Sequence, residues 1–381
     1  RRRHTRYSLQ SRGLGDVYKR QALALVVRLA HWGVVRDEPF IGQLVMDSEE
    51  YDRWGAEIAA GDWLGSEPFF QAPLYPYFLG TVYTATGPGP FRLDAIYLLQ
   101  ILLAVAGCYA LYRAGLLLGG STLGLVAAAL GAAYGPLLFY DVQLLKESPA
   151  VSTVCFLLWA LAAGCRNGGR RPWAAAGVLL GILILLRENT LLVLPFLLPL
   201  TFLGERRRAW ARIALLVAGI AIVLSPVALR NAAVGGGFLP TTFQGGVNFY
   251  IGNNPQADGT YQPLTPGRQI PAFERREPVR LAEEALGREL TPGEVSDYWL
   301  GRSLGWARQQ PVDFALLQVR KLGMFWRWYE WPDAVDYYWI AERSPAVGFP
   351  LLEFGSIALL AAAGLWTVRR RILDWSPVVL F

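Results

Sequence analysis

Residues Met46–Gly55, with the sequence MDSEEYDRWG, place four acidic side chains within the six positions from Asp47 to Asp52. The group follows a hydrophobic run, and carboxylates are costly beside hydrocarbon. One carboxylate in such a place can act as a general base that takes a proton from a hydroxyl group. Several together can hold a cation, and the same residues can also form a solvated loop.

The residues after Asp47 predict a helix along the membrane surface that ends near Gly61. Three apolar residues recur at helical spacing: Tyr51, Trp54 and Ile58. Asp47 or Ser48 can cap the start of this helix, because Glu50 stands at capping-box spacing from Asp47. The other acidic residues are expected on solvated faces: Glu49, Glu50, Asp52 and Glu57. Asp47 is therefore either a cap or a proton acceptor.

A tight metal site is disfavoured, because no histidine accompanies these carboxylates and they lack the Gly turn of an EF-hand loop. His31 lies inside the first apolar run. We expect neither a metal nor an organic cofactor. The three cysteines are expected to be packing residues, since no metal spacing or disulfide framework is present: Cys108, Cys155 and Cys165.

Polar residues also stand at the ends of other apolar runs. Asp141, Lys146 and Glu147 interrupt two runs in FYDVQLLKESPA, and Arg187, Glu188 and Asn189 form the turn in LLRENTLL. Arg92 begins a further run. An arginine at such a depth is placed to bind a phosphate with two hydrogen bonds. Snorkelling to the interface, or a local Arg187–Glu188 ion pair, is the alternative, but several such groups at one membrane face indicate a shared cavity.

Apolar runs that suit a hydrocarbon core of about 30 Å predict an all-α polytopic membrane protein with about eight to nine transmembrane helices. The runs lie near 22–35, 93–112, 121–140, 148–164, 173–186, 190–203, 210–229 and 346–367, with an incomplete ninth from about 376. The composition argues against a soluble enzyme with one large core, since only 17% of the 381 residues are charged and 53% are hydrophobic.

Basic loops set the predicted orientation. The arginines that define them are Arg113, Arg166, Arg170, Arg171, Arg206, Arg207, Arg208, Arg212 and Arg369 to Arg371. If these loops face the cytoplasm, residues 36–91 and 230–345 face outward. This assignment of loops to the two sides requires that the apolar patch 72–87 does not cross the membrane, so the patch must lie in the interface or dip in and return. Its prolines and tyrosines are compatible with an interfacial helix. The sequence alone does not decide whether 72–87 spans the membrane.

The two chain ends are expected to be incomplete. Residues 1–20 contain seven Lys/Arg and one Asp, which accounts for the whole formal charge of +6. This leader resembles a translated sequencing adaptor, and a basic cytoplasmic tail is the alternative. We therefore expect a non-native leader 1–20, a transmembrane module 21–229 with a catalytic first loop 36–91, an outward region 230–345 and truncated C-terminal segments 346–381.

The outward region 230–345 mixes turn-rich loops with amphipathic helices. Asn248, Tyr250, Asn253 and Asp258 lie in a Gly/Asn-rich stretch and can touch a sugar or an acceptor, or the stretch is a plain connection. Thr291 and Glu294 form a capping box that opens a helix towards Trp306. Residues 324–338 concentrate aromatic side chains, which predicts an interfacial belt before the eighth run.

Three sequence pieces together resemble the GT-C membrane glycosyltransferases. They are Asp47 with Tyr51, then Ala56 with Ile58-Ala59-Ala60-Gly61-Asp62-Trp63, and then Pro73-Leu74-Tyr75. The family pattern is also matched by Glu147, which stands before Ser-Pro, and by Arg187 with Asn189. The chain is similar to bacterial family 39-like members, a group that includes protein O-mannosyltransferases and the lipid A aminoarabinose transferase.

The resemblance implies a GT-C-type bundle with an outward first loop that carries juxtamembrane helices. It implies a polyprenyl-phosphate sugar donor and inverting transfer to a hydroxyl or amine on a lipid, glycan or protein acceptor. Asp47 would be the general base, and Arg187, Lys146 and Arg92 would bind the donor phosphate. Tyr51, Glu147, Asn189, Tyr75 and Asn248 would line the site. Gln71-Ala72 stands where the aminoarabinose transferase has a lysine, so that phosphate contact is not carried over and a lipid A acceptor is disfavoured.

Two other classes of protein are weighed against this one. A transporter or flippase of lipid-linked sugars would need charges along its spans, whereas the charges here gather at one face and no inverted pair of broken helices is visible. A non-catalytic membrane protein would not need Asp47. The leading expectation is a transferase in the bacterial inner membrane with its active site facing the periplasm or cell exterior, without nucleic-acid partners.

Overall fold

The computed structural model describes residue 19 and residues 21–203, 206–268, 270–331, 334–348 and 353–370. Within these ranges every regular element is a helix and no strand is present. The all-α expectation is confirmed for this part of the chain. Almost all of the predicted leader and the incomplete ninth run lie outside the described residues.

Three helices are long and apolar enough to cross a membrane: α5 (Phe91–Gly119), α8 (Glu147–Asn167) and α11 (Ala209–Ala233). A fourth candidate is the pair α6 (Ser121–Ala133) and α7 (Gly135–Asp141), which is bent by 56°. Tyr134 is extended between the two, and Pro136 follows in the first turn of α7, where proline is tolerated. The expected total of eight to nine transmembrane helices is not confirmed.

The other predicted runs form shorter apolar helices, namely Gln21–Val35, Glu188–Phe202 and α17 (Phe354–Val368), beside α9 (Arg170–Leu186). The run 190–203 is broken because Pro195 and Pro199 cannot donate backbone hydrogen bonds. It folds as the 3₁₀ helix η1 (Glu188–Val193), a single turn α10 (Leu194–Leu197) and the 3₁₀ helix η2 (Leu198–Phe202).

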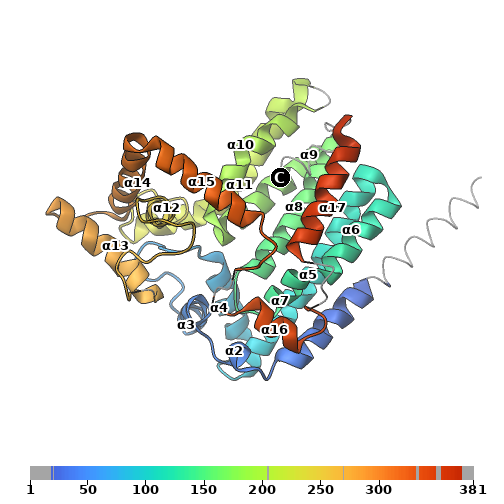
Figure 1. Ribbon diagram of the computed structural model, residues 1–381, viewed down its shortest axis with the longest axis horizontal. Helices are drawn as coiled ribbons and strands as arrows, with labels where there is room; N and C mark the ends of the chain where they lie inside the picture. Colours follow the sequence, from blue (N-terminus) through green and yellow to red (C-terminus); the bar gives the residue numbers. More distant parts are fainter. Residues whose placement is uncertain are drawn as a thin grey trace, which may run out of the picture.

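The apolar helices pack side by side as one bundle, with α5 against α6 and α8, and α9 against α8 and α11 (Figure 1). The Arg166 guanidinium at the last turn of α8 donates to the Leu118 carbonyl at the end of α5 at 3.0 Å, so these two helices run in parallel. The first residues of α5 and α8 therefore lie at one end of the bundle and the basic loop after α8 at the other.

Two helices of the first loop cover the end of the bundle where α5 and α8 begin. Helix α3 (Asp47–Ala59) confirms the predicted helix, with Tyr51 and Ile58 buried, and its position on the membrane surface stays a prediction. It packs closely on α4 (Leu74–Thr86), because a Cβ added at Gly80 would lie 2.5 Å from the Ile58 side chain. Helix α4 has 13 residues and is therefore about 20 Å long, which is shorter than a hydrocarbon core. An interfacial position stays the prediction for residues 72–87.

A separate lobe is formed by α12 (Gly245–Gly252), α13 (Pro271–Leu286), α14 (Pro292–Gln309) and α15 (Pro311–Phe325), seen at the left of Figure 1. Its small core contains Val247, Val295 and Trp299. The predicted capping box at the start of α14 is confirmed, with Thr291 and Glu294 bonded reciprocally. The remaining short helices are α2 (Pro39–Gly42), η3 (Arg206–Arg208) and α16 (Tyr337–Arg343).

Candidate functional site

Asp47 is the first residue of α3 rather than the residue that caps it. The cap position falls on Met46, whose φ of 53° lies in the left-handed region and whose side chain makes no capping bond. A non-glycine residue there stores strain of about 1–3 kcal/mol, and such strain is concentrated at functional sites. Asp47 therefore does not occupy the N-cap position, and its half-buried carboxylate stands at the positive end of the helix dipole. Its role as a proton acceptor stays a prediction.

Tyr51 lies one turn further along α3 and is the centre of the candidate site. Its ring is fully buried, and its hydroxyl has no hydrogen-bond partner among the described residues. Burial raises the pKa of this hydroxyl well above its usual value, and the nearby carboxylates of Asp47, Glu147 and Glu188 raise it further. The Lys146 ammonium lies 5.8 Å from the centroid of the Tyr51 ring. Charges from three separate segments therefore converge on one tyrosine.

Glu147 and Arg187 form an ion pair that joins the start of α8 to the end of α9. The second carboxylate oxygen of Glu147 is buried without a partner among the described residues. The local Arg187–Glu188 pair weighed as an alternative is not what forms. Glu188 instead accepts from the Thr242 hydroxyl at 2.8 Å and from the Gln244 amide at 2.7 Å, because its 3₁₀ turn directs it towards the loop before α12.

Tyr261 is a neighbour of Asp47 that inspection of the motifs missed. It lies in the loop between α12 and α13, where its hydroxyl donates to the Glu274 carboxylate. Burial and the Glu274 bond raise the pKa of Tyr261, and the Asp47 carboxylate raises it further, so the loop reaches the start of α3. No pairing signal between residues 47 and 261 exists in a single sequence. Tertiary packing alone reveals this neighbour.

The remaining predicted residues occupy different surroundings. Tyr75 is buried against Tyr51 with ring centroids 5.4 Å apart and donates to the Gln100 amide oxygen at 2.7 Å, so it supports Tyr51 from behind. Arg92 pairs with Asp52 at 2.8 Å, and Asp52 also accepts from Tyr83, which places Asp52 in a polar network rather than on a solvated face. Asn189 and Asn248 are exposed on η1 and α12, and their lining roles stay predictions.

Directly behind the cluster lies a buried polar network. Arg28, from the helix Gln21–Val35, donates to the Asp141 carboxylate at 2.7 Å and to the Ala132 carbonyl at 3.1 Å. The Ser148 hydroxyl donates to the same carboxylate at 2.6 Å. The Gln100 amide donates to the carbonyls of Asp141 and Gln143, at 3.1 and 2.9 Å. These bonds fix the short linker between α7 and α8, which carries Lys146 and leads into Glu147.

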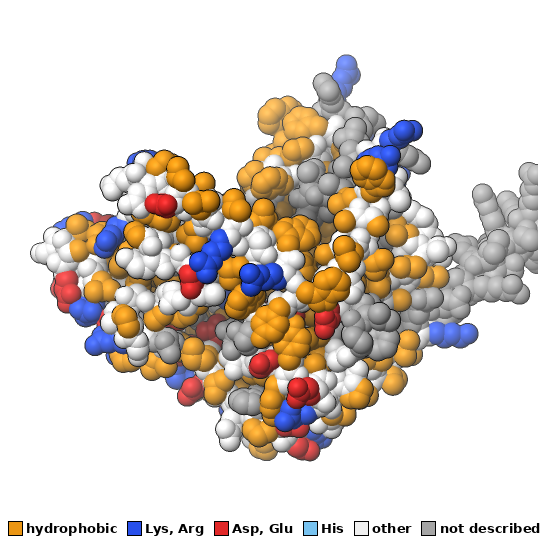
Figure 2. Space-filling view, viewed as in Figure 1, with side chains coloured by type: hydrophobic (Ala, Val, Ile, Leu, Met, Phe, Trp, Pro, Cys, Tyr) orange, Lys and Arg blue, Asp and Glu red, His pale blue; other side chains and the backbone are white. Residues whose placement is uncertain are grey.

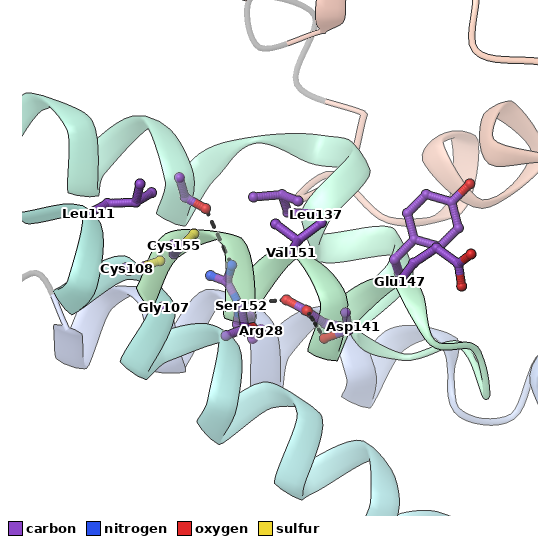
Figure 3. A pocket seen from close by; sticks show the side chains of 14 residues that line it. Arg28, Gly107, Cys108, Leu111, Leu137, Asp141, Glu147, Val151, Ser152 and Cys155 are labelled. Atoms are coloured by element: carbon purple, nitrogen blue, oxygen red, sulfur yellow. Dashed lines mark hydrogen bonds and ion pairs between the residues drawn. The ribbon is translucent and has the colours of Figure 1, made fainter. Parts of the chain in front are cut away.

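A narrow pocket borders this network (Figure 3). Cys108 and Cys155 lie at one end, Arg28 points from the first helix towards Asp141 in the middle, and Glu147 lies at the other end. The remaining lining is mostly apolar, and both cysteines are buried, as predicted for packing residues. Within the described part of the chain no three His, Cys, Asp or Glu side chains gather as a metal-binding group.

The bundle of apolar helices with a charged cluster at one end is accompanied by one family match that supports a membrane glycosyltransferase of the GT-C type. Residues 70–229 match the model of a family described as dolichyl-phosphate-mannose-protein mannosyltransferase, which belongs to the GT-C superfamily, and the resemblance found in the sequence is thereby confirmed. The match includes Lys146, Glu147 and Arg187 and begins after Asp47 and Tyr51. No curated protein matches the chain.

Proposed function

We propose that this protein moves a sugar from a polyprenyl-phosphate donor to a hydroxyl or amine of a lipid, glycan or protein acceptor. The observation that carries the proposal is the convergence of two carboxylates, two cations and one buried tyrosine hydroxyl that has no hydrogen-bond partner among the described residues, all at the same end of the bundle. Asp47 and Tyr51 come from α3, Lys146 and Glu147 from the start of α8, and Arg187 from the end of α9.

In this reaction Asp47 takes the proton from the acceptor group as the acceptor oxygen or nitrogen attacks the anomeric carbon. The new glycosidic bond forms on the face opposite the polyprenyl phosphate, and the bond between the anomeric carbon and the phosphate oxygen breaks, which inverts the configuration. Arg187 and Lys146 stabilise the charge that develops on the leaving phosphate. The Tyr51 hydroxyl and one Glu147 oxygen have no hydrogen-bond partner among the described residues, and we assign them to sugar hydroxyls of a donor that opens this buried site.

The orientation follows from the two ends of the bundle. Arg166 lies at the end of α8, and positively charged loops remain on the cytoplasmic side. The cluster around Asp47 lies at the opposite end, so we propose that it faces the periplasm of a bacterial inner membrane. A donor anchored by its lipid chain would reach this cluster from within the bilayer, where the apolar helices present exposed side chains such as Leu192 and Leu229.

The proposal is tested with membranes that contain the full chain and with a panel of radiolabelled polyprenyl-phosphate sugars. Removing a general base lowers rates by about 10²–10⁴-fold, so Asp47→Asn should lose that much transfer while it is produced and folded normally. Glu49→Gln is the matched control, because Glu49 is exposed in the same turn of α3. Transfer by Asp47→Asn at the wild-type rate would remove the base assignment. Absence of transfer from every lipid-linked sugar would contradict the function itself.

A further inference from the structure

Helix α15 has an apolar face that the rest of the protein does not cover. Five large apolar side chains are between 58% and 70% exposed and recur every three or four residues: Val312, Leu316, Val319, Leu322 and Trp326. At 100° per residue they fall within one third of the helix circumference, together with Ala315 and Gly323. A contiguous exposed apolar surface of this kind marks an interaction site.

The opposite face of α15 is fixed to the lobe by specific contacts. Leu317 is buried, and the Gln318 amide donates to the Asn253 side-chain oxygen at 2.9 Å. The Lys321 ammonium donates to the same oxygen at 3.0 Å and to the Gly252 carbonyl. Burial of this ammonium lowers the pKa of Lys321. The helix is therefore held in one rotational setting, and the direction of its apolar face is determined by the fold.

The exposed face continues onto the next apolar helix. Phe325 and Trp326, at the end of α15, both contact the ring of Phe354, the first residue of α17, with centroids 5.4 and 6.1 Å apart. Helix α17 in turn exposes Leu359 and Leu360. Figure 2 shows hydrophobic side chains along the upper rim of the left lobe, where α15 lies, and onwards across the middle of the molecule.

Length and charge identify the occupant of this surface. With 15 residues, α15 is about 22 Å long, which is too short to cross a core of about 30 Å. Arg320 is exposed on one flank of the apolar face, where its guanidinium group can meet lipid phosphates, and the exposed Arg327 follows just after the helix. A helix with an apolar stripe and a basic flank lies in the plane of the membrane interface.

We propose that α15 is an interfacial membrane helix whose apolar face rests on the lipid bilayer. The segment 230–345 then contains a membrane contact that begins upstream of the interfacial belt predicted at 324–338. The bond from Gln318 to Asn253 joins this membrane contact to the loop that follows α12. The inference concerns the lipid contact alone and holds whether or not the chain transfers a sugar.

The test is spin-label accessibility in the full chain, reconstituted in nanodiscs of phosphatidylethanolamine and phosphatidylglycerol. Cys108, Cys155 and Cys165 are first replaced by Ala, and a single label is placed at Leu316→Cys or Val319→Cys. Ile222→Cys on α11 gives the lipid reference, since Ile222 is 68% exposed on a candidate span. Asp297→Cys on exposed α14 gives the water reference.

For Leu316 and Val319 we expect a ratio of oxygen to nickel-chelate accessibility that is clearly above that of Asp297 and below that of Ile222. An interfacial helix buries its apolar face only about 5–10 Å deep, whereas Ile222 lies near the middle of a candidate span. A ratio equal to that of Asp297 would show a water-exposed face and overturn the proposal. Low accessibility to both reagents would show a protein partner on this face, with the same consequence. If a label at either position disturbs the gel-filtration profile, Ala315→Cys on the same face is used as the labelling position instead.

Discussion

Two ion pairs stand six residues apart along the linker from α7 to α8, and they are built in opposite ways. The Arg28–Asp141 pair is enclosed, with side chains only 1% and 4% exposed, and further bonds from Ser148 and to the Ala132 carbonyl satisfy the remaining polar atoms. The Arg187–Glu147 pair is open, with side chains 42% and 19% exposed, and one Glu147 oxygen lacks a partner among the described residues.

The difference separates a structural role from a binding role. Charges taken out of water are tolerated only when every donor and acceptor is satisfied, as in the enclosed pair. An open pair with an unused oxygen retains capacity for a ligand, and its partners can exchange when a phosphate arrives. The same acid–arginine combination therefore fixes the linker at Asp141 and offers a site at Glu147.

The largest effect on stability is expected from Arg28→Met. This change leaves the Asp141 carboxylate buried without its counter-charge, which costs about 3–5 kcal/mol. The midpoint of thermal unfolding, followed by fluorescence-detected gel filtration in detergent, should fall clearly. The double variant Arg28→Met/Asp141→Leu removes both charges and should recover most of the loss. If Arg28→Met unfolds at the wild-type temperature, the enclosed pair does not have the structural role assigned to it.

Arg187→Met should act on the donor instead of on the fold. Loss of hydrogen bonds to a charged group is worth about 1.5–3 kcal/mol, so KM for the polyprenyl-phosphate sugar should rise about 10–150-fold with little change in the unfolding midpoint. Arg53→Met is the control, because Arg53 is 53% exposed on α3 and bonded to Glu50 and Glu57. An unchanged KM would take Arg187 out of the donor site.

Arg92→Gln should give the smallest effect on stability and on donor binding. The variant tests whether the Arg92–Asp52 pair is structural or binds the donor phosphate. Its partner Asp52 is 18% exposed and the pair lies on the flank of α3, where such pairs contribute about 1 kcal/mol or less. We expect a small fall in the unfolding midpoint and a donor KM within twofold of the wild-type value. A rise in KM comparable to that of Arg187→Met would restore Arg92 to the phosphate-binding group.

The sequence predicted the helical elements well where a local signal was strong. The 3.6-residue spacing of Tyr51 and Ile58 gave α3, and Thr291 with Glu294 gave the start of α14. It overestimated continuity where prolines intervened, so the run 190–203 became three short pieces and the run 121–140 became a bent pair. Hydropathy averages over a window, whereas a missing backbone donor acts at one residue.

The candidate site was predictable only in part, for a similar reason. Asp47, Lys146, Glu147 and Arg187 each stood out as charged residues at the ends of apolar runs. Their partners did not stand out in the sequence. Arg187 pairs with Glu147 and not with its neighbour Glu188, and Tyr261 lies near Asp47 although the two are more than two hundred positions apart. A single sequence contains no information about such pairings.

By itself the amino-acid sequence determined that the chain is helical, apolar and charged at particular helix ends, because hydrophobicity, helical spacing and capping act within a few residues. Tertiary structure decided which charges are enclosed and which remain open, since burial depends on all the helices that meet at a point. It placed Asp47 inside the first turn of α3, enclosed Arg28 with Asp141, and turned the apolar face of α15 outwards. These three outcomes rest on long-range packing, which no local pattern encodes.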